Sequence, residues 1–171
     1  MRFTYCPDCG KQLILKEIGD EGLVPYCEAC ARPWFDMFPS CVIVLVANDK
    51  QEVALLGQSY ISTKNRTLVS GYMKPGESAE ETAEREVMEE LGIRLKELRL
   101  IRTIWFEKRG MLMLAFIGQA ENTDFHLSSE VDEAAWVPAQ EAIKLVHPKA
   151  PGVASYFLVE KYLEEIGEEI P

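Results

Sequence analysis

The sequence has no long uninterrupted apolar stretch. Its longest apolar runs are Cys41–Ala47 and Met111–Ile117, far shorter than the roughly 20 residues that a membrane-spanning helix needs. The N-terminus also lacks a charged segment followed by an apolar one, so no secretory signal is expected. We therefore predict a soluble, cytoplasmic protein that has no membrane partner.

Basic residues are scarce. The 171-residue chain has 18 Lys and Arg against 28 Asp and Glu, a net charge of −10 and a sequence pI near 4.8. Such a protein is not attracted nonspecifically to nucleic acid or to anionic membranes. A nucleic-acid partner is therefore not expected, and metal ions would mediate contact with anionic ligands.

Internal repeats and low-complexity tracts are absent too, and histidine is rare. With 47% hydrophobic residues the chain can build a core, and its length suits one ordinary domain plus a small appendage. The two histidines, His126 and His147, both lie near turn residues. We expect each to face solvent rather than to bind a metal.

Four of the five cysteines form two C-x2-C pairs. Cys6 and Cys9 are separated by seventeen residues from Cys27 and Cys30, the spacing of a zinc ribbon. We predict a structural Zn²⁺ site of four thiolates in a small domain, residues 1–36, with a hairpin turning at Gly19–Gly22. Two disulfides are the alternative, which a reducing compartment disfavours. Cys41 is expected to be a buried strand residue.

A turn followed by an acidic helix occupies the middle of the chain. Ser78 and Glu81 form a capping-box pattern and Gly92 is a stop signal, so the predicted helix covers Ala79–Leu91. Its apolar residues recur every four positions and predict a buried strip. Three carboxylates, Glu86, Glu89 and Glu90, fall along one border of that strip.

Carboxylates at this spacing repel one another by roughly 0.2–0.5 kcal/mol per pair. Mg²⁺, which takes oxygen ligands and shares them with substrate phosphates, would compensate that repulsion. The alternative is a solvated acidic helix face.

The remaining pattern predicts an α/β fold. Strands are expected at 41–48, 52–57, 67–72, 98–106, 111–120 and 134–137, and further helices at 139–145 and 153–166. Strands on both sides of the acidic helix and helices at the C-terminus indicate an α/β/α sandwich around a mixed sheet, residues 37–171.

The segment Gly71–Ile93 resembles the Nudix box, G-x5-E-x7-R-E-U-x-E-E-x-G-U with U aliphatic, and matches every defined position. A zinc ribbon directly before such a box is the layout of the NADH pyrophosphatase subfamily, which the chain resembles from Cys6 to about Tyr162. The resemblance implies the Nudix α/β/α sandwich, a small nucleotide substrate and hydrolysis of a diphosphate linkage. It also implies a homodimer.

The resemblance assigns roles to individual residues. Mg²⁺ or Mn²⁺ would be held by the carbonyl of Ser70 and by Glu86, Glu89, Glu90 and Glu130. Glu77 and Arg85 would form the buried pair that braces the loop, and Glu89 or Glu86 would be the base. Substrate contacts would come from Tyr72, which stacks on the substrate, from Phe35 as a second stacking candidate, and from the Pro151–Ala154 backbone segment, which ends at Ala154.

One motif of the subfamily is not kept. Its S-Q-P-W appears here as Arg102-Thr103-Ile104-Trp105. Trp105 could stack on a base, pack in the core or form a dimer contact, and Arg102 could pair with an extra phosphate. NADH or NAD⁺ is the leading single substrate, with ADP-ribose, FAD and dinucleoside polyphosphates as alternatives. A non-catalytic nucleotide sensor or a zinc-ribbon nucleic-acid adaptor is the alternative from another class.

Overall fold

The computed structural model describes residues 3–170 and divides the chain into two compact units, Met1–Phe38 and Pro39–Pro171. Within the described residues, no helix is long and apolar enough to cross a membrane.

The first unit is a small antiparallel sheet. Its strands are β1 (Ile14–Glu17), β2 (Leu23–Cys27) and β3 (Arg32–Pro33), in the order β1-β2-β3. A 3₁₀ turn, η1 (Gly19–Glu21), joins the first two strands, and Gly22 beside it has φ 70°, a conformation that favours glycine. The hairpin predicted around these glycines is confirmed.

The second unit is organised around one mixed sheet. Its strands are β4 (Ser40–Ala47), β5 (Glu52–Gly57), β6 (Val69–Tyr72), β7 (Leu95–Phe106), β8 (Met111–Ala120) and β9 (Glu133–Pro138). The order is β7-β8-β4-β5-β9, and β6 also pairs with β4. The pair β4 and β8 is parallel while the other pairs are antiparallel, so the expected mixed sheet is confirmed.

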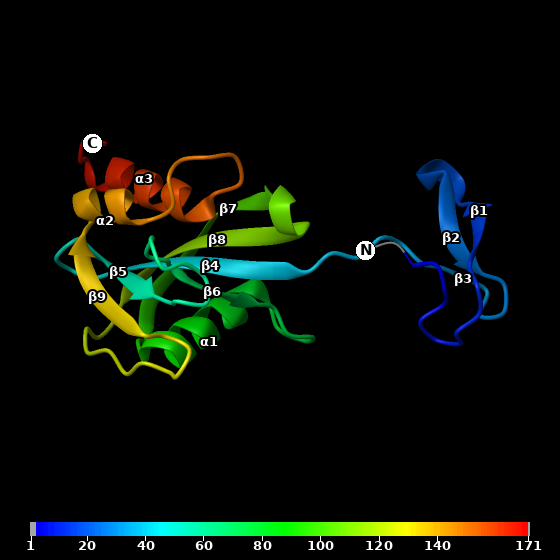
Figure 1. Ribbon diagram of the computed structural model, residues 1–171, viewed down its shortest axis with the longest axis horizontal. Coiled ribbons are helices and arrows are strands. Elements are labelled where there is room, and N and C mark those ends of the chain that lie inside the picture. Colours follow the sequence, from blue (N-terminus) through cyan, green and yellow to red (C-terminus); the bar gives the residue numbers. More distant parts are fainter. Residues whose placement is uncertain (1–2, 171) are drawn as a thin grey trace. The chain divides into compact units, whose positions relative to one another are not determined.

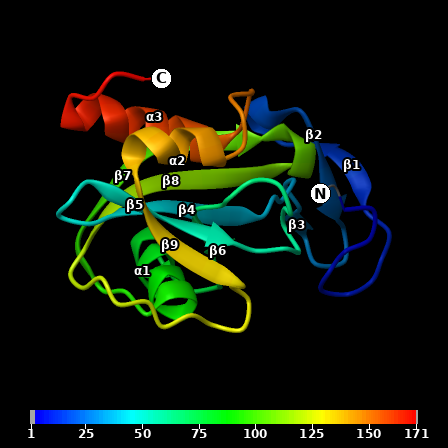
Figure 2. The same cartoon turned by 60° about the vertical axis from the view of Figure 1, so that its left-hand side comes forward.

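Helices cover both faces of this sheet. The helix α1 (Ala79–Leu91) lies on one face, and α2 (Ala139–Leu145) and α3 (Ala154–Ile166) lie on the other (Figure 1). Figure 2 shows the same three layers from another side. The alternation of β4 explains the arrangement, because Val42, Val44 and Val46 join the core beneath α1 while Ile43, Leu45 and Ala47 join the core beneath α2 and α3. The predicted α/β/α sandwich is confirmed.

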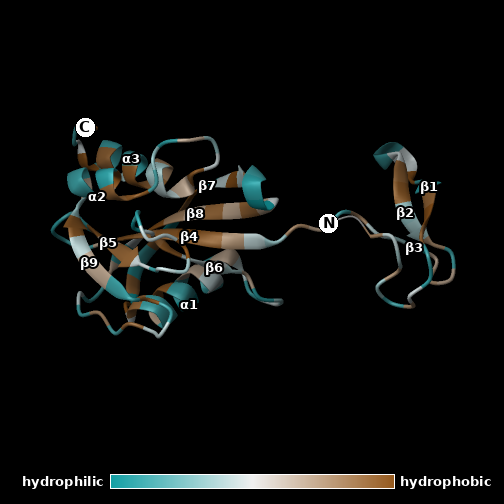
Figure 3. Ribbon diagram, viewed as in Figure 1, coloured by the Kyte–Doolittle hydropathy of each residue, from teal (hydrophilic) through white to brown (hydrophobic). Residues whose placement is uncertain are grey.

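The central strands are therefore apolar on both faces. Every residue of β4 after Ser40 is buried, and Figure 3 shows hydrophobic residues along β4, β5 and β8. Strands that are covered on both faces read as continuous apolar runs rather than as alternating ones.

The ends of α1 match the sequence prediction. Ser78 accepts a hydrogen bond from the Glu81 amide at 3.1 Å, and the Glu81 carboxylate accepts one from the Ser78 amide at 2.8 Å. Gly92 ends the helix with φ 68°, its N–H donating to Met88. Loss of an N-cap such as Ser78 costs about 1 kcal/mol of stability.

Two boundaries differ from the prediction. The strand β7 begins at Leu95 rather than at 98, and its pairing with β8 shifts register between Leu95 and Glu97 and between Leu100 and Arg102. As an edge strand with mostly exposed side chains, it has no clear alternation to mark where it starts. The strand β6 begins at Val69, while Thr67 forms an isolated bridge with Leu56.

Candidate active site

The carboxylates of α1 meet the end of β6 at a glycine. A Cβ atom placed on Gly71 would lie 2.0 Å from Cδ of Glu86. The Glu86 carboxylate therefore occupies the space that any other residue at position 71 would fill. A glycine at this point of the strand lets the helix carboxylate lie directly against the backbone.

Arg85 is the centre of an ion-pair network. Its Nε and Nη2 donate to the two carboxylate oxygens of Glu77 at 2.7 and 2.9 Å, a bidentate pair. The hydrogen bonds from Arg85, with further ones from the Lys74 amide and the Thr82 hydroxyl, lower the pKa of Glu77 to about 2. Both side chains are mostly buried, at 18% and 22% exposed. This contact pins the loop that precedes α1 to the helix.

The same guanidinium also contacts two of the helix carboxylates. Its Nη1 donates to Glu86 at 2.6 Å and to Glu89 at 3.0 Å, and its Nη2 donates to the carbonyl of Tyr72 at 3.2 Å. The pairing with carboxylates raises the pKa of Arg85. One cation thus contacts three glutamates, Glu77 of the loop before α1 and Glu86 and Glu89 of the helix itself.

Glu90 lies apart from this network. Its side chain is 4% exposed, and its Oε1 accepts a hydrogen bond from Gln58 at 3.2 Å. Its Oε2 is buried and has no hydrogen-bond partner among the described residues. Burial raises the pKa of the Glu90 carboxyl to about 7; the Gln58 hydrogen bond opposes this rise, and the charges of Glu86, Glu130 and Glu89 add to it. A buried, unpaired oxygen in a negative environment is where a cation binds well.

These groups line one large cleft of about 830 Å³ in the second unit. The size suits a nucleotide-sized ligand. Of the predicted site residues, the cleft lining includes Ser70, Tyr72, Arg85, Glu86, Glu89, Glu90, Glu130 and Ala154. Residues from β6, α1, the loop before β9 and the start of α3 therefore converge, although they lie far apart in the sequence.

Three predicted residues are placed differently. Glu77 does not line the cleft but lies behind it on Arg85, in keeping with a bracing role. Trp105, on β7, is absent from the cleft lining, and its indole N–H donates to Glu107 at 2.7 Å. Phe35 is 49% exposed in the first unit.

Tyr60 and Thr67 of the cleft lining, and the buried Gln58 that contacts both, were not predicted from the sequence. Gln58 is 1% exposed and is itself fixed by the Thr67 hydroxyl, which donates to its side-chain oxygen at 2.9 Å. Its amide nitrogen also contacts the Tyr60 hydroxyl at 3.2 Å. A glutamine after a strand has no sequence signature, because only the pairing of β5 with its neighbours brings it to α1.

His147 is less exposed to solvent than predicted. It is half-buried, lines the cleft and contacts the Asn65 side chain through Nδ1 at 3.0 Å. His126 is exposed, as expected. The loop between α2 and α3 folds back over the sheet, so a residue close to turn residues in sequence is brought into the cleft.

The carboxylate arrangement fits a hard divalent cation. The unpartnered Glu90 oxygen and the Glu86 carboxylate against Gly71 offer oxygen ligands, the type that Mg²⁺ and Mn²⁺ prefer. The fit depends on this donor set and not on the acidic helix face alone, since Glu80 and Glu84 of the same helix lie outside the cleft lining.

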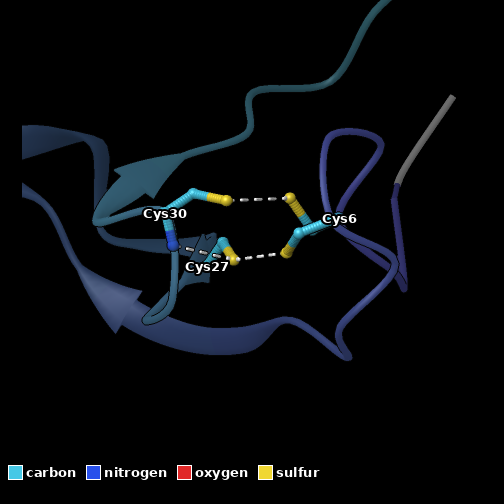
Figure 4. A group of neighbouring side chains, drawn as sticks. Cys6, Cys27 and Cys30 are labelled. Carbon is cyan, nitrogen blue, oxygen red and sulfur yellow. Dashed lines mark hydrogen bonds between the residues drawn. The ribbon is translucent and has the colours of Figure 1, made fainter.

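The cysteines of the first unit form a second candidate metal site. The sulfur atoms of Cys6, Cys9, Cys27 and Cys30 all lie within 4.8 Å of one another. The sulfur atoms of Cys6 and Cys30 are separated by 3.9 Å and face each other in Figure 4, and those of Cys9 and Cys27 are separated by 3.6 Å. A tetrahedral zinc with about 2.3 Å Zn–S bonds places its sulfurs about 3.8 Å apart, whereas a disulfide bond is about 2.05 Å long.

The sequence was compared with protein-family models and with curated proteins. The model of the NUDIX domain matches residues 37–157. The chain is 29% identical over 161 residues to the NAD-capped RNA hydrolase NudC of Escherichia coli O9:H4, covering 91% of this chain and 58% of that protein. It is 26% identical over 161 residues to the protein of the same name from Photobacterium profundum, covering 94% and 58%. The chain thus spans less than two thirds of the length of these curated relatives.

A solved structure shows the same fold. The crystal structure of a NUDIX hydrolase from Nitrosomonas europaea superposes with a TM-score of 0.72 at 21% identity, covering 97% of this chain and 94% of that chain. At 21% identity this similarity shows that the two proteins share a fold.

Proposed function

The chain belongs to the Nudix family of hydrolases, and from this premise we propose that it cleaves the diphosphate linkage of a nucleoside diphosphate derivative with the help of Mg²⁺ or Mn²⁺. The observation that carries the proposal is the buried, unpartnered oxygen of Glu90 beside the Glu86 carboxylate in a nucleotide-sized cleft.

The cation would be held by Glu86, Glu90 and Glu130 with the carbonyl of Ser70, and Glu89 completes the cluster. When bound, it neutralises phosphoryl oxygens and lowers the pKa of water. The glutamates supply the charge that holds the cation in a cleft, and Gln58 fixes the orientation of the Glu90 carboxylate. Arg85 keeps Glu86 and Glu89 from separating under their mutual repulsion.

We assign the general base to Glu89. Its side chain is 53% exposed, compared with 13% for Glu86, so water reaches it more readily. Arg85 donates to one of its oxygens, and the other lies 3.8 Å from the Lys74 ammonium, beyond hydrogen-bond distance. That oxygen accepts the proton of the attacking water.

The substrate we propose is an adenine-containing diphosphate, with NADH or NAD⁺ as the leading single candidate but not strongly preferred. Tyr72 is 53% exposed at the edge of the cleft and can stack on a flat ring. Residues 102–105, which replace the S-Q-P-W motif, are absent from the cleft lining. The similarity to proteins named NAD-capped RNA hydrolases supports a nicotinamide dinucleotide linkage as substrate.

Zinc bound by the four cysteines would be structural in this proposal. All four ligand positions are taken by thiolates, so no position is left for a substrate. Three further points remain predictions. They are the division into a zinc ribbon at 1–36 and a Nudix domain at 37–171, the homodimer, and the cytoplasmic location.

The test is kcat/KM for NADH, NAD⁺, ADP-ribose, FAD and diadenosine polyphosphates under one set of conditions, with product analysis. We expect cleavage at the diphosphate and less than about 200-fold discrimination among adenine-containing substrates, because a stacking contact does not read ring edges. A thousandfold preference for NADH would refute the weak discrimination. Binding without any turnover would favour the nucleotide sensor instead.

A further inference from the structure

The cleft contains positive charge that the proposed reaction does not use. Four Lys or Arg side chains line it: Lys74, Arg85, Lys108 and Arg109. Arg85 and Lys74 already contact the helix glutamates. Lys108 and Arg109 form no ion pair or side-chain hydrogen bond within residues 3–170.

These two residues lie on one short, well-defined turn. The basic turn, residues 107–110, contains the 3₁₀ helix η2 (Glu107–Arg109) and joins β7 to β8. Gly110 closes it with φ 57°, and its N–H donates to the Glu107 carbonyl at 3.1 Å. The backbone that carries Lys108 and Arg109 is therefore held in place by local hydrogen bonding.

The acidic residue of the turn, Glu107, forms no ion pair with them in the described part of the chain. The Glu107 carboxylate accepts a hydrogen bond from the Trp105 indole at 2.7 Å. Trp105 precedes Glu107 in the chain, whereas Lys108 and Arg109 follow it. Although the chain has a net charge of −10, these two exposed cations at the wall of the cleft have no acidic ion-pair partner among residues 3–170. A bound anion would supply that partner.

The turn also lies beside the rest of the cleft. Figure 1 and Figure 2 both show η2 at the same end of the sheet as the loop between α2 and α3. A Cβ on Gly152 of that loop would lie 3.5 Å from the Phe106 ring. Burial and the charge of Glu86 raise the pKa of the Cys41 thiol to about 11, and the charge of Arg109 acts against this rise. Arg109 is thus within electrostatic range of the Cys41 thiol, which also lines the cleft.

Arg102, the other candidate for an extra phosphate, lies elsewhere. It lines a separate pocket of about 210 Å³ between β7 and α3, where its guanidinium lies 4.9 Å from the centre of the Phe157 ring. It is absent from the lining of the large cleft. The unpaired cations of that cleft, in the described part of the chain, therefore come from the basic turn.

We propose that Lys108 and Arg109 form a phosphate subsite, which binds a further phosphate group of the substrate beyond the diphosphate held at the glutamates. Nucleotides linked through three or more phosphates would then be favoured over NADH and NAD⁺, the diphosphates that stand first when the glutamate site is considered alone. This inference rests on the proposed function, since it extends the same cleft. It predicts a preference that depends on charge rather than on the identity of the base.

The experiment compares kcat/KM for diadenosine tetraphosphate with kcat/KM for ADP-ribose, in the full chain with excess Mg²⁺. In K108Q/R109Q we expect the ratio of the two values to fall at least tenfold, because one charge-assisted phosphate contact is worth roughly 10- to 100-fold. The charge-preserving K108R/R109K should restore most of the ratio. Lys144→Gln, on the exposed surface of α2, is the matched control and should leave the ratio unchanged.

A second measurement separates this inference from the proposed function. Calorimetry of inorganic tripolyphosphate binding, with Mg²⁺ in excess, needs no turnover. Weaker binding in K108Q/R109Q by at least tenfold supports the subsite even if no nucleotide is cleaved, an outcome that would refute the proposed hydrolysis alone. Equal binding in the variant and the wild type, or an equal loss for both nucleotides, overturns the subsite.

Discussion

The cysteine cluster and the carboxylate cleft both gather groups that suit a cation, but they lie in units built in opposite ways. In the first unit the buried apolar residues besides cysteine are Val24 and Pro25, among those the structure describes. In the second unit two apolar cores cover both faces of the sheet. A unit of this size with so few buried apolar residues would depend on a bound metal for stability, as we propose for the cysteine cluster. The large unit has cores of its own and can leave a buried charge unpaired for function.

The candidate metal ligands of the two units are also arranged differently. The four sulfurs lie within 4.8 Å of one another, so a zinc ion bound by all four would have no open position. The glutamates instead line an open cleft of about 830 Å³, and one Glu90 oxygen has no partner there. The comparison teaches that a closed ligand set stabilises a fold, while an incomplete one on a stable scaffold serves chemistry.

The largest effect that tests this comparison is removal of zinc. Chelation should unfold the first unit and leave the second intact, because structural zinc contributes about 10–16 kcal/mol of apparent binding free energy to such small units. Hydrogen exchange followed by mass spectrometry should show lost protection at 14–33 and retained protection at 40–166. Elemental analysis should find one zinc per chain, also in Cys41→Ser. Purified protein without zinc, with cysteines that resist alkylation until reduced, would favour the disulfides.

The next largest effect is expected from Glu90→Gln. The substitution keeps the shape but removes one charge from the proposed cation site, so kcat/KM should fall by more than tenfold, about 1.4 kcal/mol of transition-state stabilisation. The matched control is Glu84→Gln, an exposed residue on the same helix. A Glu90→Gln enzyme with more than a tenth of the wild-type activity would contradict the role of Glu90 as a ligand.

Without a divalent cation, the same substitution should increase the stability of the second unit, although it lowers activity. The folded-state pKa of Glu90 is raised to about 7, so ionising this carboxyl opposes folding. The destabilisation is absent below about pH 4, grows as pH rises from there to 7, and is constant above. At pH 8 metal-free Glu90→Gln should therefore be more stable than the wild type, by up to about 3 kcal/mol.

Urea unfolding of both proteins in a chelator, at pH 4.5 and at pH 8, measures this difference. Because the chelator also removes zinc, the probe must report on the second unit, for example hydrogen exchange at 40–166. A variant less stable than the wild type at pH 8 would show that the Glu90 charge is already compensated within the protein.

The smallest effect is expected from Gln58→Met. The amide donates to Glu90 and accepts from Thr67, both inside the protein, so its loss leaves the Glu90 carboxylate free to turn. We expect Mn²⁺ affinity to weaken about tenfold, since one hydrogen bond to a charged group contributes about 1.5 kcal/mol. Mn²⁺ binding is measured by electron paramagnetic resonance. Gln140→Met on α2 is the control, and equal affinities would show that Gln58 has only a packing role.

Much of this protein could be predicted because its signals are local. The limits of α1 were predicted from Ser78, Glu81 and Gly92, since caps are made by residues within one turn of the helix end. The apolar run of β4 predicted a strand for the same kind of reason. Two C-x2-C pairs were enough to predict the cysteine cluster, because short spacing forces paired sulfurs together.

The rest depended on contacts between residues far apart in the chain. Gln58 reaches Glu90 across 32 positions, and His147 reaches the cleft through a loop that folds over the sheet. The start of β7 was misplaced because an exposed edge strand lacks the alternation that burial imposes.

The sequence by itself thus determined the helix ends, the cysteine cluster and which glutamates share one helix border, since these follow from spacing along a regular backbone. The tertiary structure alone decided which of those glutamates is buried and which is exposed. It also decided that Lys108 and Arg109, rather than Arg102, line the cleft, because the pairing of β7 with β8 sets which residues form the turn at the cleft. Burial and charge at a site arise from neighbours that are distant in sequence, and only the packed fold brings them together.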